Sequence, residues 1–244
     1  RQALIDAYAY WIGVADFDGF RIDTLKHVEY GFWEVFAPAI RQYAADRGKD
    51  NFLMFGEAFD GNDELLGSYT FGNGVDSVFY FSQKFQVIDG VFAYGGPTSQ
   101  IEDLIDARKD NYSNQPKPMG PQSADGEGIP PRDMLVNFVD NHDIPRFLYN
   151  KPSIPALHNA LFYLMTIDGI PCIYYGTEQQ FDGGNDPFNR EDMWKSGFDT
   201  ENQTFQHIKT LIQIRKDLAP LRRGDLQVRW STTRTGDEQD AGIF

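Results

Sequence analysis

The amino-acid sequence predicts an α/β fold whose parallel sheet is either an open sheet or a (β/α) barrel. Short apolar runs with strand character alternate five times with helical patterns along the chain, and this alternation indicates parallel strands joined by helical crossovers. No Gly-x-Gly-x-x-Gly or Walker loop follows any of the apolar runs, which disfavours a nucleotide-binding open sheet.

The predicted elements follow one another in a regular order. Apolar residues at helical spacing predict a helix over 1–14, and the strand at 17–23 comes next. A second helix is predicted over 28–47, with Gly48 in the usual position after a helix end. The remaining strands are predicted over 51–57, 75–81, 135–139 and 169–175, and the remaining helices over 85–92, 101–108, 154–166 and 205–218. Residues 110–131 contain five prolines and are predicted as a loop, as are residues 176–193.

Composition and charge exclude several classes of partner. The 244 residues carry 22 Lys and Arg against 36 Asp and Glu, a net charge of −14, which argues against binding nucleic acid or an anionic membrane. Aromatic residues make up 15% of the chain, enough to line a groove for a neutral partner such as a sugar. The single cysteine, Cys172, excludes an internal disulfide and a thiolate metal cluster. No apolar stretch approaches the length of a transmembrane helix.

Carboxylates follow three of the predicted strands: Asp23 the first, Glu57 the second, and Asp140 and Asp143 the fourth. In a barrel the carboxyl ends of all strands gather at one face, so these groups can meet. Side chains alternate along a strand, so Arg21 lies on the same side as Asp23 and holds that carboxylate ionised. A second carboxylate in a drier and less charged setting, as expected for Glu57, can hold a proton. Such a pair is the arrangement of retaining glycosidases.

The loop after the fourth strand adds two polar side chains with sugar-binding chemistry. His142 can hydrogen-bond a sugar hydroxyl, and Asp143 can hold two adjacent hydroxyls. We expect either Asp140 or Asn141 to order the backbone of this loop.

Four segments resemble, in order, sequence regions of the α-amylase family (glycoside hydrolase family 13). Residues 19–27, GFRIDTLKH, are similar to the second conserved region of that family, residues 55–58 to the third, and residues 138–143 to the fourth. Residues 169–178, GIPCIYYGTE, are similar to the stretch at the eighth barrel strand.

The resemblance implies a role for each residue of the site. Asp23 is implied as the nucleophile that forms a covalent glycosyl-enzyme, Glu57 as the general acid and then base, and Asp143 as the group that stabilises the transition state. The residues implied to bind substrate are Arg21, Lys26, His27, His142, Asp186 and Arg190. The family's structural calcium is implied as a cofactor, with the backbone carbonyl of His27 as one ligand.

Part of the family pattern has no counterpart in this sequence. The first conserved region, Asp-x-x-x-Asn-His, is absent, as are the first three strands and the small domain that would supply most calcium ligands. We therefore expect a fragment of a longer enzyme: residues 1–220 as the C-terminal portion of a (β/α)8 TIM barrel, about strands 4 to 8, and residues 221–244 as the start of a C-terminal β-sandwich domain.

The function that the resemblance implies is retaining hydrolysis of α-1,4-glucosidic bonds in starch and maltooligosaccharides. Three alternatives stay open: a maltodextrin or cyclodextrin hydrolase, a glucanotransferase of the same family, and an inactive glucan-binding fragment. An extracellular or periplasmic location is expected for such an enzyme.

Overall fold

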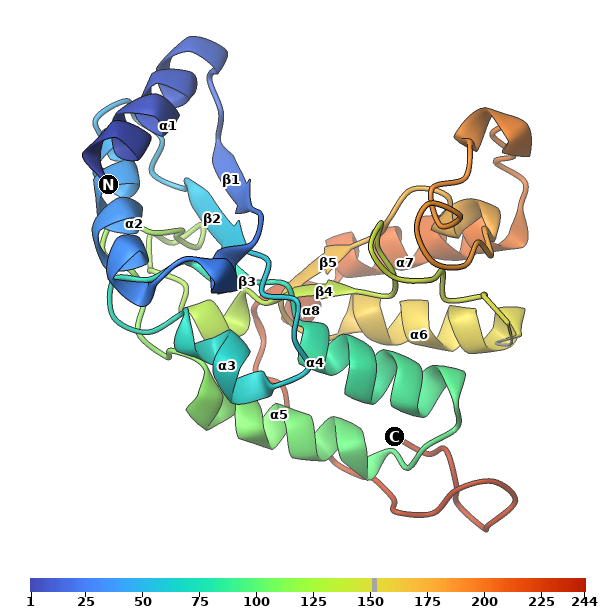
Figure 1. Ribbon diagram of the computed structural model, residues 1–244. Helices are drawn as coiled ribbons and strands as arrows, with labels where there is room; N and C mark the ends of the chain where they lie inside the picture. Colours follow the sequence, from blue (N-terminus) through green and yellow to red (C-terminus); the bar gives the residue numbers. More distant parts are fainter. Residues whose placement is uncertain (151–152) are drawn as a thin grey trace. The chain divides into compact units, whose positions relative to one another are not determined.

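The computed structural model describes residues 1–150 and 153–244 (Figure 1). The contacts divide the chain into two compact units. Unit 1 contains Arg1–Ser82 and Asp106–Val136, and unit 2 contains Gln83–Ile105 and Asn137–Phe244. Each unit combines helices with short strands, so the predicted α/β class is confirmed.

Unit 1 contains a three-stranded parallel sheet in the order β1 (Gly19–Ile22), β2 (Leu53–Gly56) and β3 (Ser77–Val78). The first helix, α1 (Gln2–Ala15), precedes β1, and α2 (Tyr30–Ala45) connects β1 to β2. Helix α1 packs against α2. Parallel neighbours joined through a helix are the βα pattern that the sequence predicts.

Aromatic rings fill the core between this sheet and its helices. Phe20 on β1 meets the rings of Phe52 and Tyr8 edge to face, with centroids 5.0 and 5.4 Å apart. Trp33 and Phe36 on α2 are buried on the same helix face. Their spacing of three residues is the helical period that puts side chains on one face, so burial of this face positions α2.

A buried ion pair joins α2 to the sheet of unit 1. Asp76 has no exposed surface, and its Oδ1 lies 2.8 Å from Nη2 of Arg41. The other oxygen, Oδ2, accepts the backbone N–H of Met54 on β2 at 2.8 Å. Burial raises the pKa of the Asp76 carboxyl, and the Arg41 guanidinium opposes that rise.

The rest of unit 1 is anchored on the start of α3 (Asp63–Ser68). The Asp63 carboxylate accepts hydrogen bonds from Tyr112 Oη at 2.8 Å, Asn111 Nδ2 at 2.6 Å and Ser82 Oγ at 2.5 Å. Residues 112–130 form the predicted loop, and a short 3₁₀ helix, Pro131–Asp133, follows it.

Unit 2 contains a pair of short strands, β4 (Val136–Phe138) and β5 (Ile170–Cys172). The unit takes in β4 from its second residue, Asn137. Helix α6 (Ile154–Thr166) packs against α7 (Gln203–Asp217) and against the helix η2 (Lys84–Ala93). Arg215 on α7 joins these elements, because its guanidinium donates to three backbone carbonyls at the end of α6 and the approach to β5. The unit also contains the first part of α5 (Ser99–Asn111) and the short α8 (Pro220–Arg223).

Three elements differ clearly from the sequence prediction, and β5 covers only Ile170–Cys172 of the predicted 169–175. The helix predicted over 85–92 is a ten-residue π-helix, Lys84–Ala93, in which the ammonium of Lys84 pairs with the carboxylate of Asp89 five residues later. The strand predicted over 75–81 is reduced to Ser77–Val78, because α4 (Phe81–Gln83) begins soon after it.

The C-terminal segment is the third difference. Residues 224–244 contain turns and irregular stretches but no strand, so the predicted start of a β-sandwich is not shown. The hydroxyl of Thr98, just before α5, accepts the backbone N–H of Thr232 at 3.0 Å and donates to the carbonyl of Ile243 at 2.7 Å. These bonds fix the segment to unit 2.

Within residues 1–150 and 153–244, no helix combines the length and apolar character needed to cross a bilayer.

Candidate active site

The first cluster of predicted site residues lies in unit 1, where β1 ends. Arg21 is on β1, and its Nη1 lies 2.8 Å from Oδ1 of Asp23, as the alternation of side chains along the strand predicts. The other guanidinium nitrogen, Nη2, lies 3.0 Å from Oε1 of Glu57. One arginine therefore pairs with both carboxylates.

The strand pairing explains why these groups meet. Ile22 on β1 lies opposite Gly56 on β2, and the N–H of Glu57 donates to the carbonyl of Ile22 at 2.8 Å. In return, the carbonyl of Glu57 accepts the N–H of Leu25 at 2.8 Å. A Cβ at position 56 would lie 2.5 Å from Cδ2 of Leu25. Glycine therefore allows the turn after Asp23 to pack onto β2.

The surroundings of Glu57 were predicted to be dry and weakly charged, and only the first is confirmed. Its side chain is 8% exposed, so the setting is dry as predicted. It is not less charged, because the Arg21 guanidinium contacts it directly. The Asp23 side chain is 67% exposed and therefore open to a ligand.

The residue after Asp23 has an unusual backbone conformation. Thr24 has φ of +53°, in the left-handed region that a β-branched residue rarely adopts. Such backbone outliers concentrate at functional sites, and this one turns the chain from β1 into the 3₁₀ helix Leu25–His27.

Lys26 points to the loop that follows Glu57. Its ammonium donates to the carbonyl of Phe59 at 2.5 Å and lies 3.2 Å from Oδ2 of Asp60. Hydrogen bonds from the N–H of Asn62 and from Lys26 lower the pKa of Asp60. Sequence reasoning missed Asp60, whose only signal is its place three residues after Glu57. His27, predicted to bind substrate, is exposed.

The second cluster lies in unit 2, in the loops after β4 and β5. Nε2 of His142 lies 3.1 Å from Oδ2 of Asp143. Arg190 reaches this pair from the second loop: its Nη2 lies 3.6 Å from Oδ1 of Asp143, and its Nε donates to the carbonyl of His142 at 3.2 Å. The same Nε lies 2.8 Å from Oδ1 of Asp186. All four predicted residues of unit 2 are therefore brought together.

Buried polar groups order the loop that carries His142 and Asp143. Asp140 accepts the N–H of Phe147 and the hydroxyl of Thr177, each at 3.0 Å. Burial raises the pKa of the Asp140 carboxyl. Oδ1 of Asn141 accepts the N–H of Asp143 at 2.9 Å. Both Asp140 and Asn141 thus order the loop, where the sequence predicts that one of them does.

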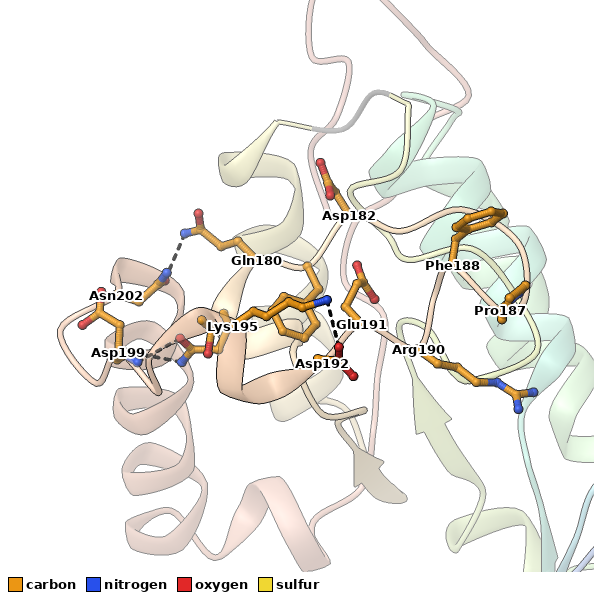
Figure 2. Close-up of a pocket in the computed structure, with 13 residues that line it drawn as sticks. Gln180, Asp182, Pro187, Phe188, Arg190, Glu191, Asp192, Lys195, Asp199 and Asn202 are labelled. Atoms are coloured by element: carbon orange, nitrogen blue, oxygen red, sulfur yellow. Dashed lines mark hydrogen bonds and ion pairs between the residues drawn. The ribbon is translucent and has the colours of Figure 1, made fainter.

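An open pocket of about 570 Å³ borders the second cluster (Figure 2). Its lining combines amides, carboxylates and an exposed ring, including Gln180, Asp182, Phe188, Arg190, Asp192 and Asn202. Figure 2 shows Lys195 turned toward Asp192, with the two charges 2.8 Å apart, while Arg190 extends away from them.

The residues that the structure describes form no carboxylate cluster for calcium. Calcium takes about six to eight oxygen ligands. Among the residues that the structure describes, no three His, Cys, Asp or Glu side chains are grouped to hold a metal. The carbonyl of His27 therefore has no such cluster to join within the described residues.

Comparison with known proteins identifies the family. The α-amylase catalytic-domain family matches residues 1–224. The chain belongs to the α-amylase family. It is 33% identical over 198 residues to α-amylase 1 of Lipomyces kononenkoae, covering 81% of this chain and 27% of that protein. It is 32% identical over 241 residues to a cyclomaltodextrin glucanotransferase of Thermoanaerobacterium thermosulfurigenes, covering 94% of this chain and 30% of that protein.

A solved structure supports the same assignment. The crystal structure of an Anoxybacillus α-amylase superimposes with a TM-score of 0.79 at 28% identity, covering 95% of this chain and 47% of that one. This α-amylase-family chain therefore spans less than half the length of each of these three relatives.

Proposed function

We propose that the full-length protein is a retaining glycoside hydrolase that cleaves α-1,4-glucosidic bonds in starch and maltooligosaccharides. The observation that carries this proposal is the Arg21 guanidinium, which pairs with both Asp23 and Glu57. A retaining glycosidase needs two carboxyl groups close together, one as nucleophile and one as acid and base. Membership of the α-amylase family over residues 1–224 supports α-glucans as the substrate class.

Asp23 is the proposed nucleophile. Its carboxylate attacks C1 of the sugar while Glu57 gives a proton to the departing glucosidic oxygen, which forms a covalent glycosyl-enzyme. Water then attacks the same carbon while Glu57 takes a proton from it, so the product keeps the starting configuration. The ion pair with Arg21 orients the Asp23 carboxylate for this attack.

The cluster in unit 2 supplies the proposed sugar contacts. Asp143 is a half-exposed carboxylate that can accept hydrogen bonds from two adjacent hydroxyls, and His142 beside it can bind a third. Asp186 and Arg190 are proposed to bind neighbouring sugars. Lys26 and His27 are proposed to lie on the leaving-group side, with Lys26 held there by Asp60.

Glucan transfer is the second candidate function. It is favoured by the 32% identity to a cyclomaltodextrin glucanotransferase over 94% of this chain. Hydrolysis and transfer share the glycosyl-enzyme and differ in whether water or a sugar hydroxyl accepts the glycosyl group.

The experiment that tests the proposal is product analysis with the full-length protein and maltoheptaose. We expect α-anomers as the first products by NMR, and a glycosyl label on the peptide containing Asp23 when a slow fluorinated α-glucosyl fluoride is used. Cyclic or elongated products would favour transfer, and binding without cleavage would favour an inactive glucan-binding protein. β-anomers as first products would exclude retention.

A further inference from the structure

We propose that Arg146 is a positioning residue of the active site, which sets the place of Arg190 relative to Asp143 by tying the loop after β4 to the loop after β5. The proposal rests on the proposed function, because it assigns Arg146 to the substrate-binding cluster of unit 2. Neither the sequence motifs nor the family resemblance pointed to Arg146.

Arg146 is charged and fully enclosed by other groups of unit 2. Its side chain has no exposed surface, and a buried guanidinium is costly unless it is paired. Its Nε lies 3.0 Å from Oε2 of Glu191, and its Nη1 donates to the carbonyl of Tyr175 at 2.6 Å. Both contacts come from the loop after β5, while Nη2 is buried without a hydrogen-bond partner among the described residues.

Three aromatic rings surround the same guanidinium. The Arg146 guanidinium carbon lies 4.1 Å from the ring centre of Tyr174, 5.0 Å from that of Tyr175 and 5.4 Å from that of Phe181. Arginine can stack on rings and bind through two nitrogens at once, whereas lysine offers a single point charge. The site is therefore specific for arginine.

The partners of Arg146 lie next to the site residues in the sequence. Arg146 follows Asp143 by three residues, and Glu191 directly follows Arg190. The second oxygen of Glu191, Oε1, accepts the N–H of Gly183 at 2.6 Å, and the carbonyl of Gly183 accepts the N–H of Arg146 at 3.0 Å. Arg146, Glu191 and Gly183 thus form a closed ring of contacts that joins the loop after β4 to the loop after β5.

Arg190 depends on this ring because its own contacts are long or exposed. Its side chain is 46% exposed, and its short ion pair, 2.8 Å to Asp186, is with an exposed residue of the same loop. Its contacts to the loop after β4 are longer, at 3.2 Å to the carbonyl of His142 and 3.6 Å to Asp143. The neighbouring Glu191 is held at both oxygens. A displacement of about 1 Å in a substrate-binding group can cost about 100-fold in rate. A shift of Glu191 would move the adjacent Arg190, and substrate binding would weaken as a result.

The test is a double-mutant cycle in the full-length protein with maltoheptaose. Arg146→Lys, Arg190→Gln and the double variant are compared by KM, kcat and thermal midpoint. If Arg146 acts through Arg190, Arg146→Lys lowers kcat/KM about tenfold in the wild-type background, mainly by raising KM, because lost substrate binding raises KM. In the Arg190→Gln background it changes kcat/KM less than twofold, because coupled positions are not additive.

The control is Arg234→Lys, since Arg234 is an exposed arginine that pairs with Asp240 at 3.5 Å. We expect it to leave KM and kcat within twofold. Should Arg146→Lys fail to fold, Glu191→Gln keeps the size of the side chain and one acceptor oxygen, but removes the charge and replaces the second acceptor with an NH2 donor. It is expected to show the same coupling.

Each outcome decides between the two proposals. Equal losses in both backgrounds, with a matching fall in thermal midpoint, mean that Arg146 is only structural, while cleavage by the wild type upholds the proposed function. If the wild type binds maltoheptaose without cleaving it, the same cycle is measured on Kd. If it neither binds nor cleaves, the proposed function is wrong and the positioning role falls with it.

Discussion

Arg21 is the residue on which the candidate chemistry depends most. Its pairing with Asp23 follows from the sequence, because residues two apart on a strand share a side. Its pairing with Glu57 does not, since it requires the register of β1 against β2, in which Arg21 lies opposite Phe55. Sequence reasoning therefore predicted the dry setting of Glu57 but missed its charge partner.

Replacing the proposed nucleophile gives the first prediction. Asp23→Asn keeps the size of the side chain but removes the negative charge that attacks C1, so we expect kcat on starch to fall by about four orders of magnitude or more. Initial rates on soluble starch measure this. Turnover within tenfold of wild type would remove Asp23 from this role.

The proposed proton donor gives the second prediction. Glu57→Gln cannot protonate a leaving group, so we expect hydrolysis of starch to fall about 100-fold to 10,000-fold. The rate of hydrolysis of an α-glucosyl fluoride should fall much less, because fluoride leaves without protonation. The ratio of the two rates in variant and wild type is the measurement, and equal losses on both substrates would indicate a different acid.

At the scale of elements, helices with long apolar periodicity were predicted within a few residues. Helix α6 was predicted over 154–166 and spans those residues. The π-helix Lys84–Ala93 was predicted as an ordinary helical stretch, because a few apolar residues cannot distinguish the two. The C-terminal run around Trp230 has strand-like composition but pairs with no strand in the described residues, and composition alone cannot supply a partner.

The ion pair between α2 and the sheet gives the third prediction. Asp76→Asn leaves the buried Arg41 charge without a carboxylate, so we expect unit 1 to lose about 3–5 kcal/mol of stability. Denaturant unfolding of the full-length protein measures this. The matched control is Asp106→Asn, whose exposed pair with Lys109 should contribute less than about 1 kcal/mol. A similar loss in both variants would argue against a special role for burial.

The contact between α6 and α7 gives the fourth prediction. The rings of His158 and His207 stack at 4.3 Å, and burial, followed by the His207 charge, lowers the pKa of His158. A histidine with a lowered folded-state pKa stabilises the fold above its unfolded pKa, about 6.5, and this stability is lost as pH falls below that value.

We therefore expect the thermal midpoint to drop between pH 7.5 and 5.5, and His158→Gln to reduce that drop. Thermal scans at the two pH values, with His27→Gln as an exposed comparison, measure the difference. An identical drop in wild type and His158→Gln would contradict the assignment.

At the scale of the whole molecule, the sequence predicted strands that alternate with helices in the observed order. It did not predict that the described residues divide into two compact units, because the division depends on contacts between distant segments such as 1–82 and 106–136. The predicted boundary at residue 220 stays a prediction. So does the (β/α)8 barrel of the full-length protein.

The fifth prediction concerns calcium and belongs to the scale of the whole molecule. No group of three or more His, Cys, Asp and Glu side chains in the described residues could hold the ion, so we expect a site to include residues outside this chain. If the full-length protein completes a site around the His27 carbonyl, EDTA removes a ligand of the folded state and lowers the thermal midpoint by about 5 °C. EDTA saturated beforehand with calcium is the control. An unchanged midpoint would argue against structural calcium.

The contact between Asp76 and Met54 has a further consequence for hydrogen exchange. The Met54 amide is fully buried and bonded to a carboxylate that is itself enclosed, so its proton exchanges with solvent only when β2 separates from Asp76. Protection at a buried core amide reports the free energy of that opening. Met54 therefore provides unit 1 with an internal reporter that needs neither substrate nor catalytic activity.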